Sequence, residues 1–245
     1  KLKHSSCVGT WSMLGSPMAA EVLASTGLDF VILDLEHGLF DFNDVVHSVR
    51  SIQVRNSQAI IRVSENSQPH ILRALETSPN GILIPNISSY AEAKKAVSFC
   101  YYNPQGVRGL SPYTRVHAFH HENLETSINH TNENLMVGIL VEGEQGIKEV
   151  PEILNIPGLD VIYFGIYDYS LALGYKGDIF NPEVQKSLKS MVENCNKKNI
   201  ACGTFFRNIQ DVRAYKEMGM KFIAYGSDGM VLKEGYNCLF KTDVS

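Results

Sequence analysis

Short apolar runs alternate with segments of helical pattern along the whole chain, and this alternation limits the fold more than any other feature. Each run is bounded by turn residues, which is typical of a strand covered on both faces. We expect strands at 7–12, 30–33, 59–63, 81–85, 137–142, 160–165, 201–206 and 222–226. We expect helices at 17–27, 41–52, 70–77, 90–100, 121–132, 146–154, 182–198 and 210–218, and a last one from 228.

Strands that are each followed by a helix predict a parallel sheet, because the helix returns the chain to the same edge. Eight such units predict closure into an α/β fold of the (β/α)8 TIM-barrel type, and 245 residues is an ordinary length for one. An open doubly wound sheet is the alternative, but no glycine-rich phosphate motif follows the first strand. We therefore expect a single barrel domain over residues 1–245.

Composition argues against several classes of partner. The formal net charge of −4 and the scattered basic residues give no electrostatic reason to expect nucleic acid or a membrane surface. No apolar segment approaches the ~20 residues of a membrane span, and the N-terminus lacks the apolar core of a signal peptide. The five cysteines are dispersed and form no CxxC, which argues against a disulfide framework. We expect a cytoplasmic protein.

Ionisable residues stand at the carboxyl ends of several expected strands, which form the active face of a barrel. They are Asp34, Glu36, His37, Arg62, Glu142 and Asp168. Helix capping can explain one such residue, but charges that close several apolar strands point toward one another across the barrel mouth. The sequence therefore predicts a polar active site there.

These residue types favour metal-assisted chemistry on a keto acid. Glu142 and Asp168, after adjacent strands, offer hard oxygen ligands that suit an Mg²⁺- or Mn²⁺-type ion. Arg62 can hold a carboxylate or an enolate oxygen with its fork of donors. His37 can move a proton near neutral pH, with Asp34 or another acid to orient it. Schiff-base chemistry is the competitor, but no expected strand ends in lysine.

Several short motifs follow one another in a compatible order. They are Asp34-x-Glu36-His37, Arg62, Ile84-Pro85, Pro104-x-Gly106-x-Arg108-Gly109, Glu142, Gly165-x-x-Asp168 and Asn181-Pro182-Glu183-Val184. As a set over about residues 9–232, they resemble the HpcH/HpaI aldolases, metal-dependent class II pyruvate aldolases of the phosphoenolpyruvate/pyruvate barrel superfamily. The resemblance implies a lyase that reversibly cleaves a 2-keto-3-deoxy-4-hydroxy acid to pyruvate and an aldehyde through a metal-stabilised enolate.

The resemblance also implies roles for the residues at the strand ends. Glu142 and Asp168 would bind the divalent metal, which could be Mg²⁺, Mn²⁺ or Co²⁺. Arg62 would contact the keto oxygen of pyruvate and stabilise the enolate. His37 would be the catalytic acid and base, acting through a metal-bound water beside Asp34.

Further contacts are implied for substrate and subunit binding. The backbone from Gly165 through Ile166 and Tyr167 would receive the substrate carboxylate. Trp11, at the end of the first strand, is expected either to line the pocket or to pack in the core. Family members are commonly hexamers, trimers of dimers that exchange the last helix, so we expect a homo-oligomer between dimer and hexamer. In them an acid after the third strand, Glu76 here, reaches a histidine of a neighbour.

The chain departs from the family pattern near the expected substrate. Leu140 stands where a glutamine usually precedes the metal-binding glutamate by two residues, so a polar contact on the same face is lost. Ile166-Tyr167 is bulkier than the usual Pro-Ala pair, and Ser78-Pro79 replaces a small Gly-Ala pair. These changes leave the metal and enolate residues in place but bear on the second substrate.

Three functions remain open from the sequence. The first is the aldol cleavage described above. The second is a citrate-synthase-like Claisen condensation of oxaloacetate with an acyl-CoA, which Leu140 and Ile166-Tyr167 motivate. The third is a barrel that binds a keto acid without turnover. The identity of the aldehyde is not encoded in the strands, because loops and a neighbouring subunit would form its pocket.

Overall fold

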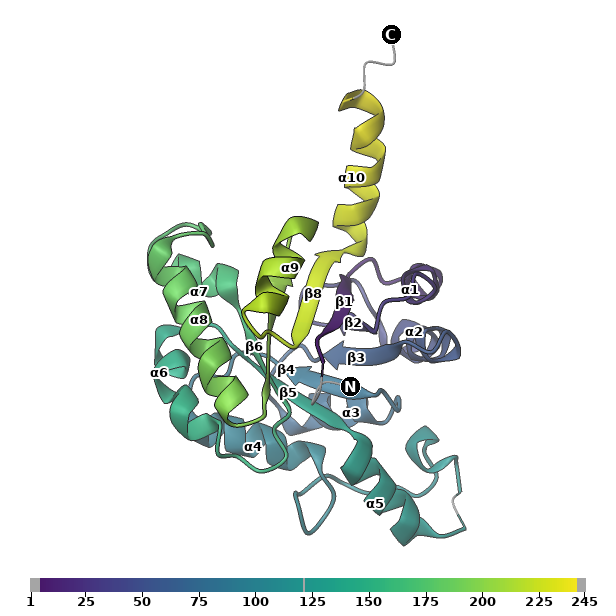
Figure 1. The fold of residues 1–245 in the computed structure, drawn as a ribbon. Helices are drawn as coiled ribbons and strands as arrows, with labels where there is room; N and C mark the ends of the chain where they lie inside the picture. Colours follow the sequence, from purple (N-terminus) through teal and green to yellow (C-terminus); the bar gives the residue numbers. More distant parts are fainter. Residues whose placement is uncertain (1–4, 121, 242–245) are drawn as a thin grey trace.

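The strands close into a barrel in the order β1 to β8, and every neighbouring pair is parallel (Figure 1). The structure is a computed structural model and describes residues 5–120 and 122–241. The strands are β1 (Cys7–Ser12), β2 (Phe30–Asp34), β3 (Gln58–Arg62), β4 (Gly81–Ile84), β5 (Met136–Val141), β6 (Val161–Phe164), β7 (Ala201–Phe206) and β8 (Phe222–Ser227). The predicted barrel is confirmed, and the open sheet is excluded.

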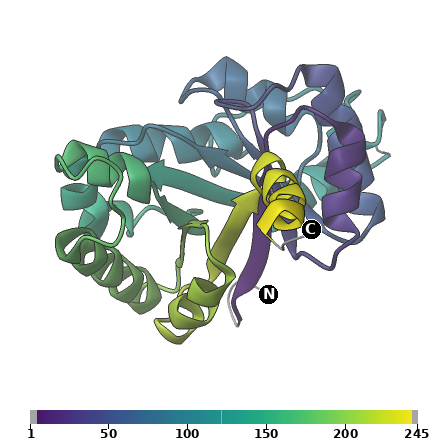
Figure 2. The same cartoon turned by 90° about the horizontal axis from the view of Figure 1, so that it is seen from above.

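Helices follow the strands and surround the barrel when it is viewed from above (Figure 2). They are α1 (Pro17–Ala24), α2 (Phe42–Val54), α3 (Gln68–Leu75), α4 (Tyr90–Cys100), the 3₁₀ turn η1 (Arg115–His117), α5 (Leu124–Asn134), α6 (Glu144–Ile153), α7 (Ile166–Ala172), α8 (Pro182–Lys197), α9 (Ile209–Glu217) and α10 (Asp228–Lys241).

Two helices differ from the prediction. No helix was expected between residues 165 and 182, but this segment contains α7, which is too short to show a helical period in the sequence. The polar helix α5 begins at Leu124, because the side chain of Asn123 caps it by accepting the amide of Thr126 at 3.0 Å. Residue 121, where we expected this helix to begin, lies outside the described residues.

Alternating residues of each strand build two separate cores, as the period of two requires. In β2, Val31 and Leu33 face the surrounding helices, whereas Phe30 and Ile32 point into the barrel. Phe30 stacks on Phe222 with their ring centroids 4.1 Å apart. The barrel is therefore packed with side chains below its mouth.

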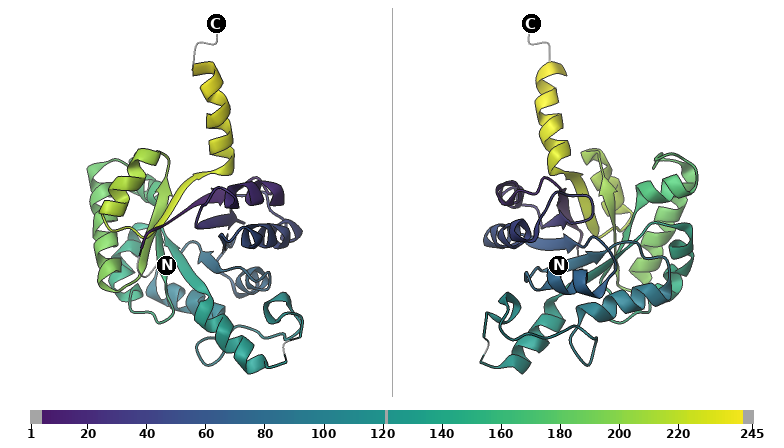
Figure 3. Two further views of the ribbon diagram at one scale, coloured as in Figure 1. Left: turned by 45° about the vertical axis from the view of Figure 1, so that its right-hand side comes forward. Right: turned by 180° about the vertical axis from the view of Figure 1, so that it is seen from behind.

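The last helix, α10, leaves the barrel instead of lying against it, and projects beyond it in every side view (Figures 1 and 3). It carries exposed apolar side chains, which are Val231, Leu232, Tyr236, Leu239 and Phe240. Across residues 5–120 and 122–241, none of the helices has the length and apolar character needed to cross a membrane.

Candidate active site

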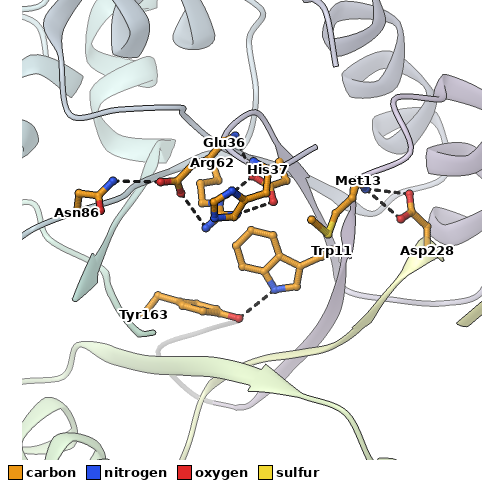
Figure 4. A network of polar contacts seen from close by, with 9 residues as sticks. Trp11, Met13, Glu36, His37, Arg62, Asn86, Tyr163 and Asp228 are labelled. Atoms are coloured by element: carbon orange, nitrogen blue, oxygen red, sulfur yellow. Dashed lines mark hydrogen bonds and ion pairs between the residues drawn. The ribbon is translucent and has the colours of Figure 1, made fainter. Parts of the chain in front are cut away.

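Arg62 is the centre of a buried ion-pair network at the barrel mouth (Figure 4). It ends β3 directly beside Asp34, which ends β2, because the two residues are register partners. Arg62 Nε donates to Asp34 Oδ1 at 2.8 Å, and Nη2 donates to Oδ2 at 2.5 Å. Its Nη1 lies 2.9 Å from Glu36 Oε2. Burial alone would lower the pKa of Arg62, but these two carboxylates raise it above its usual value.

Asp34 also shapes the segment that follows β2. Its Oδ1 accepts the backbone amides of Glu36 at 3.0 Å and His37 at 3.2 Å. This local turn carries Glu36 back over Arg62, where it also accepts a hydrogen bond from Asn86 Nδ2 at 3.1 Å. Asp34 therefore caps its own turn and also fixes the guanidinium of Arg62.

His37 lies on the same turn with an exposed side chain. Its imidazole makes no hydrogen bond or ion pair with any residue that the structure describes, so the ring remains available to substrate or water at the mouth. Its predicted role as acid and base stays a prediction. The predicted role of Asp34 in positioning water also stays a prediction. Each oxygen of its carboxylate accepts a hydrogen bond from Arg62.

Trp11 lies inside the barrel next to Arg62. The Arg62 Cζ atom is 4.6 Å from the Trp11 ring centroid, a cation–π contact. The indole Nε1 donates to the hydroxyl of Tyr163 at 3.0 Å. Of the two expectations for Trp11, the structure shows the packing contact with Arg62; contact with substrate stays a prediction.

The loop that follows Trp11 is tied to the start of α10. Asp228 Oδ2 accepts the hydroxyl of Ser12 at 2.9 Å and the backbone amide of Leu14 at 3.1 Å. The amide of Met13 donates to the same carboxylate at 3.0 Å. Asp228 also caps its own helix through the amide of Gly229 at 2.8 Å.

Glu142 and Asp168 form a carboxylate pair beside this network. Glu142 follows β5, and Asp168 lies in the first turn of α7. Burial raises the pKa of Glu142 to about 7, and the charges of Asp168 and Glu36 add to the rise. Arg62 and a backbone hydrogen bond from Asn86 act in the opposite direction. Clustered acids of this kind are stabilised by a cation.

The residues present fit a divalent metal ion. A Cβ on Gly165 would lie 2.6 Å from Glu142 Cβ and 3.1 Å from Glu142 Oε2, so this glycine keeps space open beside the carboxylate. Among the described residues, no group of three or more His, Cys, Asp or Glu side chains converges as a metal centre. Glu142 and Asp168 would therefore supply two oxygen ligands, and water and substrate the rest.

A pH dependence follows from the raised pKa of Glu142. Because a carboxylate ligand must be ionised, a metal ion competes with a proton below about pH 7. We expect the affinity for Mg²⁺ or Mn²⁺ to fall by about tenfold for each pH unit below about 7. Calorimetric titrations from about pH 5 to about pH 8 measure this.

The raised pKa of Glu142 also makes the stability of the metal-free protein depend on pH. The folded-state pKa of Glu142 lies above its ordinary value of 4.5, so the folded state binds the extra proton. Its contribution to stability is therefore largest below about pH 4.5 and declines as the pH rises toward about 7. Glu142→Gln should remove this slope from thermal unfolding, and a slope unchanged by that substitution would contradict the assignment.

Other predicted site residues are placed differently. Glu76 caps the C-terminal end of α3, away from the mouth, and accepts Arg108 Nη2 at 3.1 Å. Ile166 is buried in the outer core, and the Gly165 amide already donates to the Val141 carbonyl at 2.9 Å. Glu76 lies away from the Arg62 network, and its expected reach into a neighbouring subunit stays a prediction. Gly165 lies beside Glu142, and the expected contact of the 165–167 backbone with the substrate carboxylate also stays a prediction.

Sequence reasoning gave too little weight to two residues. Glu36 contacts Arg62 and raises the pKa of Glu142, which its place among the ionisable residues after β2 does not by itself specify. No local signal indicates this contact, because Glu36 lies beyond the end of β2 and reaches Arg62 through the turn around Asp34. Tyr163 was expected only as part of an apolar strand, and no local signal shows that its hydroxyl meets Trp11.

A cavity of about 780 Å³ lies at the opposite end of the barrel, among the N-terminal ends of the strands. Its lining includes Asp29, Phe30 and Asp160. Asp29 and Asp160 accept the backbone amides of Val8 and Val137, each at 2.9 Å. Asp29 and Asp160 thus tie neighbouring strands together at the N-terminal face of the barrel, where residues contribute to stability. We therefore place the chemistry at the mouth, which is the opposite face.

A closed parallel barrel with acids and a buried arginine at its strand ends places the chain among the TIM-barrel enzymes. The model of the HpcH/HpaI aldolase/citrate lyase family matches residues 8–234, and the chain belongs to that family. The curated relatives that it matches are named as aldolases, a class of lyases, and we assign the chain to that class.

Relatives and solved structures agree with this placement. The chain is 32% identical to a 5-keto-4-deoxy-D-glucarate aldolase of Citrobacter koseri, over 90% of this chain and 85% of the relative. It is 30% identical to the enzyme of that name from Salmonella arizonae, over 96% and 91%. A crystal structure of a family member from Burkholderia cenocepacia superposes with a TM-score of 0.93 at 28% identity, covering 100% of this chain and 97% of that one. A citrate synthase structure, at 24% identity and a TM-score of 0.88, shares the fold.

Proposed function

We propose that this aldolase cleaves a 2-keto-3-deoxy-4-hydroxy acid that carries a second carboxylate at its far end. The class includes 5-keto-4-deoxy-D-glucarate, the substrate named for the relatives above. Cleavage of the bond between its deoxy carbon and the neighbouring hydroxylated carbon gives pyruvate and a hydroxy-aldehyde acid. The observation that carries the proposal is the buried Arg62, held by two acids beside the Glu142 and Asp168 pair.

Arg62 is oriented for one task at the reacting keto acid. Asp34 binds Nε and Nη2, and Glu36 binds Nη1, which leaves an N–H donor on each terminal nitrogen for a substrate oxygen. A fixed cation beside the keto oxygen stabilises the negative charge that develops there as the carbon–carbon bond breaks. His37 moves the proton between the 4-hydroxyl group of the substrate and water, because its exposed imidazole lies on the adjacent turn.

Glu142 and Asp168 would hold the divalent ion that the family uses. When bound, this ion supplies positive charge at the substrate oxygens next to Arg62. The charge of the pair and its hard oxygen atoms support Mg²⁺, Mn²⁺ or Co²⁺ without separating them. The cytoplasmic location expected from the dispersed cysteines stays a prediction.

Arg207 is a cation near the barrel mouth, and its position favours a substrate with a second carboxylate. Arg207 follows the end of β7, and its guanidinium Nε is 3.9 Å from Glu234 Oε1. Burial raises the pKa of Tyr167, and the charge of the nearby Arg207 opposes that rise, so the two side chains lie near each other. An arginine in this position can bind a carboxylate on the aldehyde half of the substrate.

Pyruvate release tests the proposal. Protein with Mg²⁺ or Mn²⁺ is given 5-keto-4-deoxy-D-glucarate and a matched keto acid whose far carboxylate is a hydroxymethyl group. The proposal expects pyruvate from the first and a several-fold lower kcat/KM for the second. Equal values of kcat/KM for the two keto acids would show that the second carboxylate of the substrate is not recognised. Thiol release from acetyl-CoA and oxaloacetate, without pyruvate from either acid, would support the Claisen reaction instead.

We also propose that α10 packs on a second copy of the chain. Its apolar side chains are exposed, and α1 presents Met18 and Val22, which are 78% and 64% exposed. A helix that leaves its own barrel and an uncovered neighbouring helix can satisfy each other between two protomers. This arrangement supports the expected homo-oligomer.

A charge on α10 should therefore break the assembly. Leu239→Asp places a carboxylate in the proposed interface, and we expect on the order of tenfold weaker association or more. Light scattering after size exclusion measures the oligomer. Val54→Asp, at another exposed apolar residue, which lies on α2, is the control and should leave the oligomer intact. A monomeric unaltered protein would reject the exchange.

A further inference from the structure

Tyr163 lies at the centre of the barrel with its hydroxyl close to the catalytic arginine. Its side chain is 3% exposed, and its ring packs edge-on against Trp11 with the ring centroids 5.5 Å apart. On its other side, the ring packs edge-on against Phe222 at 6.2 Å. Two aromatic neighbours leave the ring little freedom to move, so its hydroxyl is a fixed point inside the barrel.

The hydroxyl has one defined partner, and this partner contacts Arg62. Trp11 Nε1 donates to Tyr163 Oη at 3.0 Å, and the same indole lies 4.6 Å from Arg62 Cζ (Figure 4). The three side chains therefore form a chain of contacts that runs from the packed barrel interior to the mouth. Asp34 and Glu36 hold the nitrogen atoms of Arg62, whereas Trp11 contacts the guanidinium through its ring.

Tyr163 lies beside Leu140, the residue at which this chain departs from the family pattern. Leu140 and Tyr163 are register partners on β5 and β6, and both belong to the inner core. A leucine at 140 offers no hydrogen bond at this level of the barrel, where the family pattern has a glutamine. Tyr163 returns one polar group to the same level from the adjacent strand.

We propose that Tyr163 is a positioning residue: its hydroxyl holds the Trp11 indole in place and thereby fixes the Arg62 guanidinium at the mouth. The inference rests on the proposed function, since it concerns the arginine that stabilises the reacting keto acid. Without the hydroxyl, the indole N–H has no acceptor at this point and the ring can tilt. Arg62 would then keep its acidic partners but lose the ring that sets its orientation.

The test removes only the hydroxyl, with Tyr163→Phe. Trp11 is the single tryptophan of the chain, so the intrinsic fluorescence of the purified protein reports its surroundings directly. We expect emission at shorter wavelength, because the indole loses a hydrogen-bond acceptor. We expect the exchange of deuterium into the methyl group of pyruvate to slow by about fivefold to tenfold. NMR measures this exchange in a Mg²⁺ buffer that is free of Mn²⁺. KM for the keto acid should change less than kcat.

Tyr101→Phe is the matched control. Tyr101 is also buried, and its hydroxyl donates to the Gly158 carbonyl at 2.7 Å on the outside of the barrel. This variant loses one tyrosine hydrogen bond of the same kind, so it should lose similar thermal stability. Its Trp11 emission and its exchange rate should match those of the unaltered protein.

A double-mutant cycle separates positioning through Trp11 from direct action on substrate. If Tyr163 acts through Trp11, Tyr163→Phe has no further effect on the exchange rate in a Trp11→Phe background. An equal loss in both backgrounds, or an exchange rate that Tyr163→Phe does not change, overturns the inference. If Tyr163→Phe does not fold, Trp11→Phe removes the same hydrogen bond and must slow exchange. An unaltered protein that shows no exchange would instead refute the proposed function.

Discussion

Replacing Arg62 with alanine should lower turnover of the keto-acid substrate by about a thousandfold or more, the largest loss expected from any single substitution. Removal of one fixed donor to a developing oxyanion already costs about a hundredfold to a thousandfold, and Arg62 also carries a full charge. Stability should fall by roughly 3–5 kcal/mol as well, because the buried Asp34 carboxylate is left without its cation. Steady-state kinetics and urea unfolding measure the two effects.

Two further variants separate chemistry from folding. Arg62→Lys keeps the charge but not the planar fork, so it should recover stability more than turnover. Arg115 is a half-buried arginine far from the network, which donates to the Thr77 carbonyl at 2.6 Å. Arg115→Ala should lose stability while its turnover per folded molecule stays near that of the unaltered protein. Full turnover in Arg62→Ala would remove Arg62 from the mechanism.

Glu142→Gln should have the second-largest effect, and its two consequences have opposite signs. The amide cannot supply a charged oxygen to a divalent ion, so we expect metal affinity to fall by about a hundredfold and turnover with it. In the metal-free protein the same change removes a carboxylate that burial and Asp168 disfavour, so the melting temperature above about pH 7 should rise.

Calorimetry with Mn²⁺ and thermal unfolding with a chelator measure these effects. Glu144→Gln is the control, because Glu144 is an exposed acid in the first turn of α6, two residues further along the chain. It should alter neither quantity. Unchanged metal affinity in Glu142→Gln would show that the metal is bound elsewhere, and a lower melting temperature would contradict the unfavourable charge on Glu142.

Local patterns were sufficient to predict the barrel, because each strand is an apolar run and each helix that was predicted shows its own period. Asp34, Arg62, Glu142 and Asp168 could be placed at the mouth, because the carboxyl ends of parallel strands share one face. What these residues touch could not be predicted in detail. Glu36 reaches Arg62 only because a turn around Asp34 bends the chain back.

Buried polar contacts between distant segments account for most of the remaining differences. His117, for example, is fully buried, and Tyr102 and Ser127 bind its two ring nitrogens. Tyr163 and Trp11 meet across 152 positions of the sequence. A single sequence contains no signal for such pairs, since they depend on barrel closure and not on local periodicity.

Deuterium exchange into pyruvate is the sharpest test of the proposed role of Arg62 and the metal ion, because it isolates proton transfer at the keto acid from the identity of the aldehyde. We expect the unaltered protein with Mg²⁺ or Mn²⁺ to exchange the methyl protons in D₂O. We also expect a chelator or Arg62→Ala to abolish the exchange. Exchange that persists with both the chelator and Arg62→Ala, or pyruvate release from the keto acid without any exchange, would contradict that role.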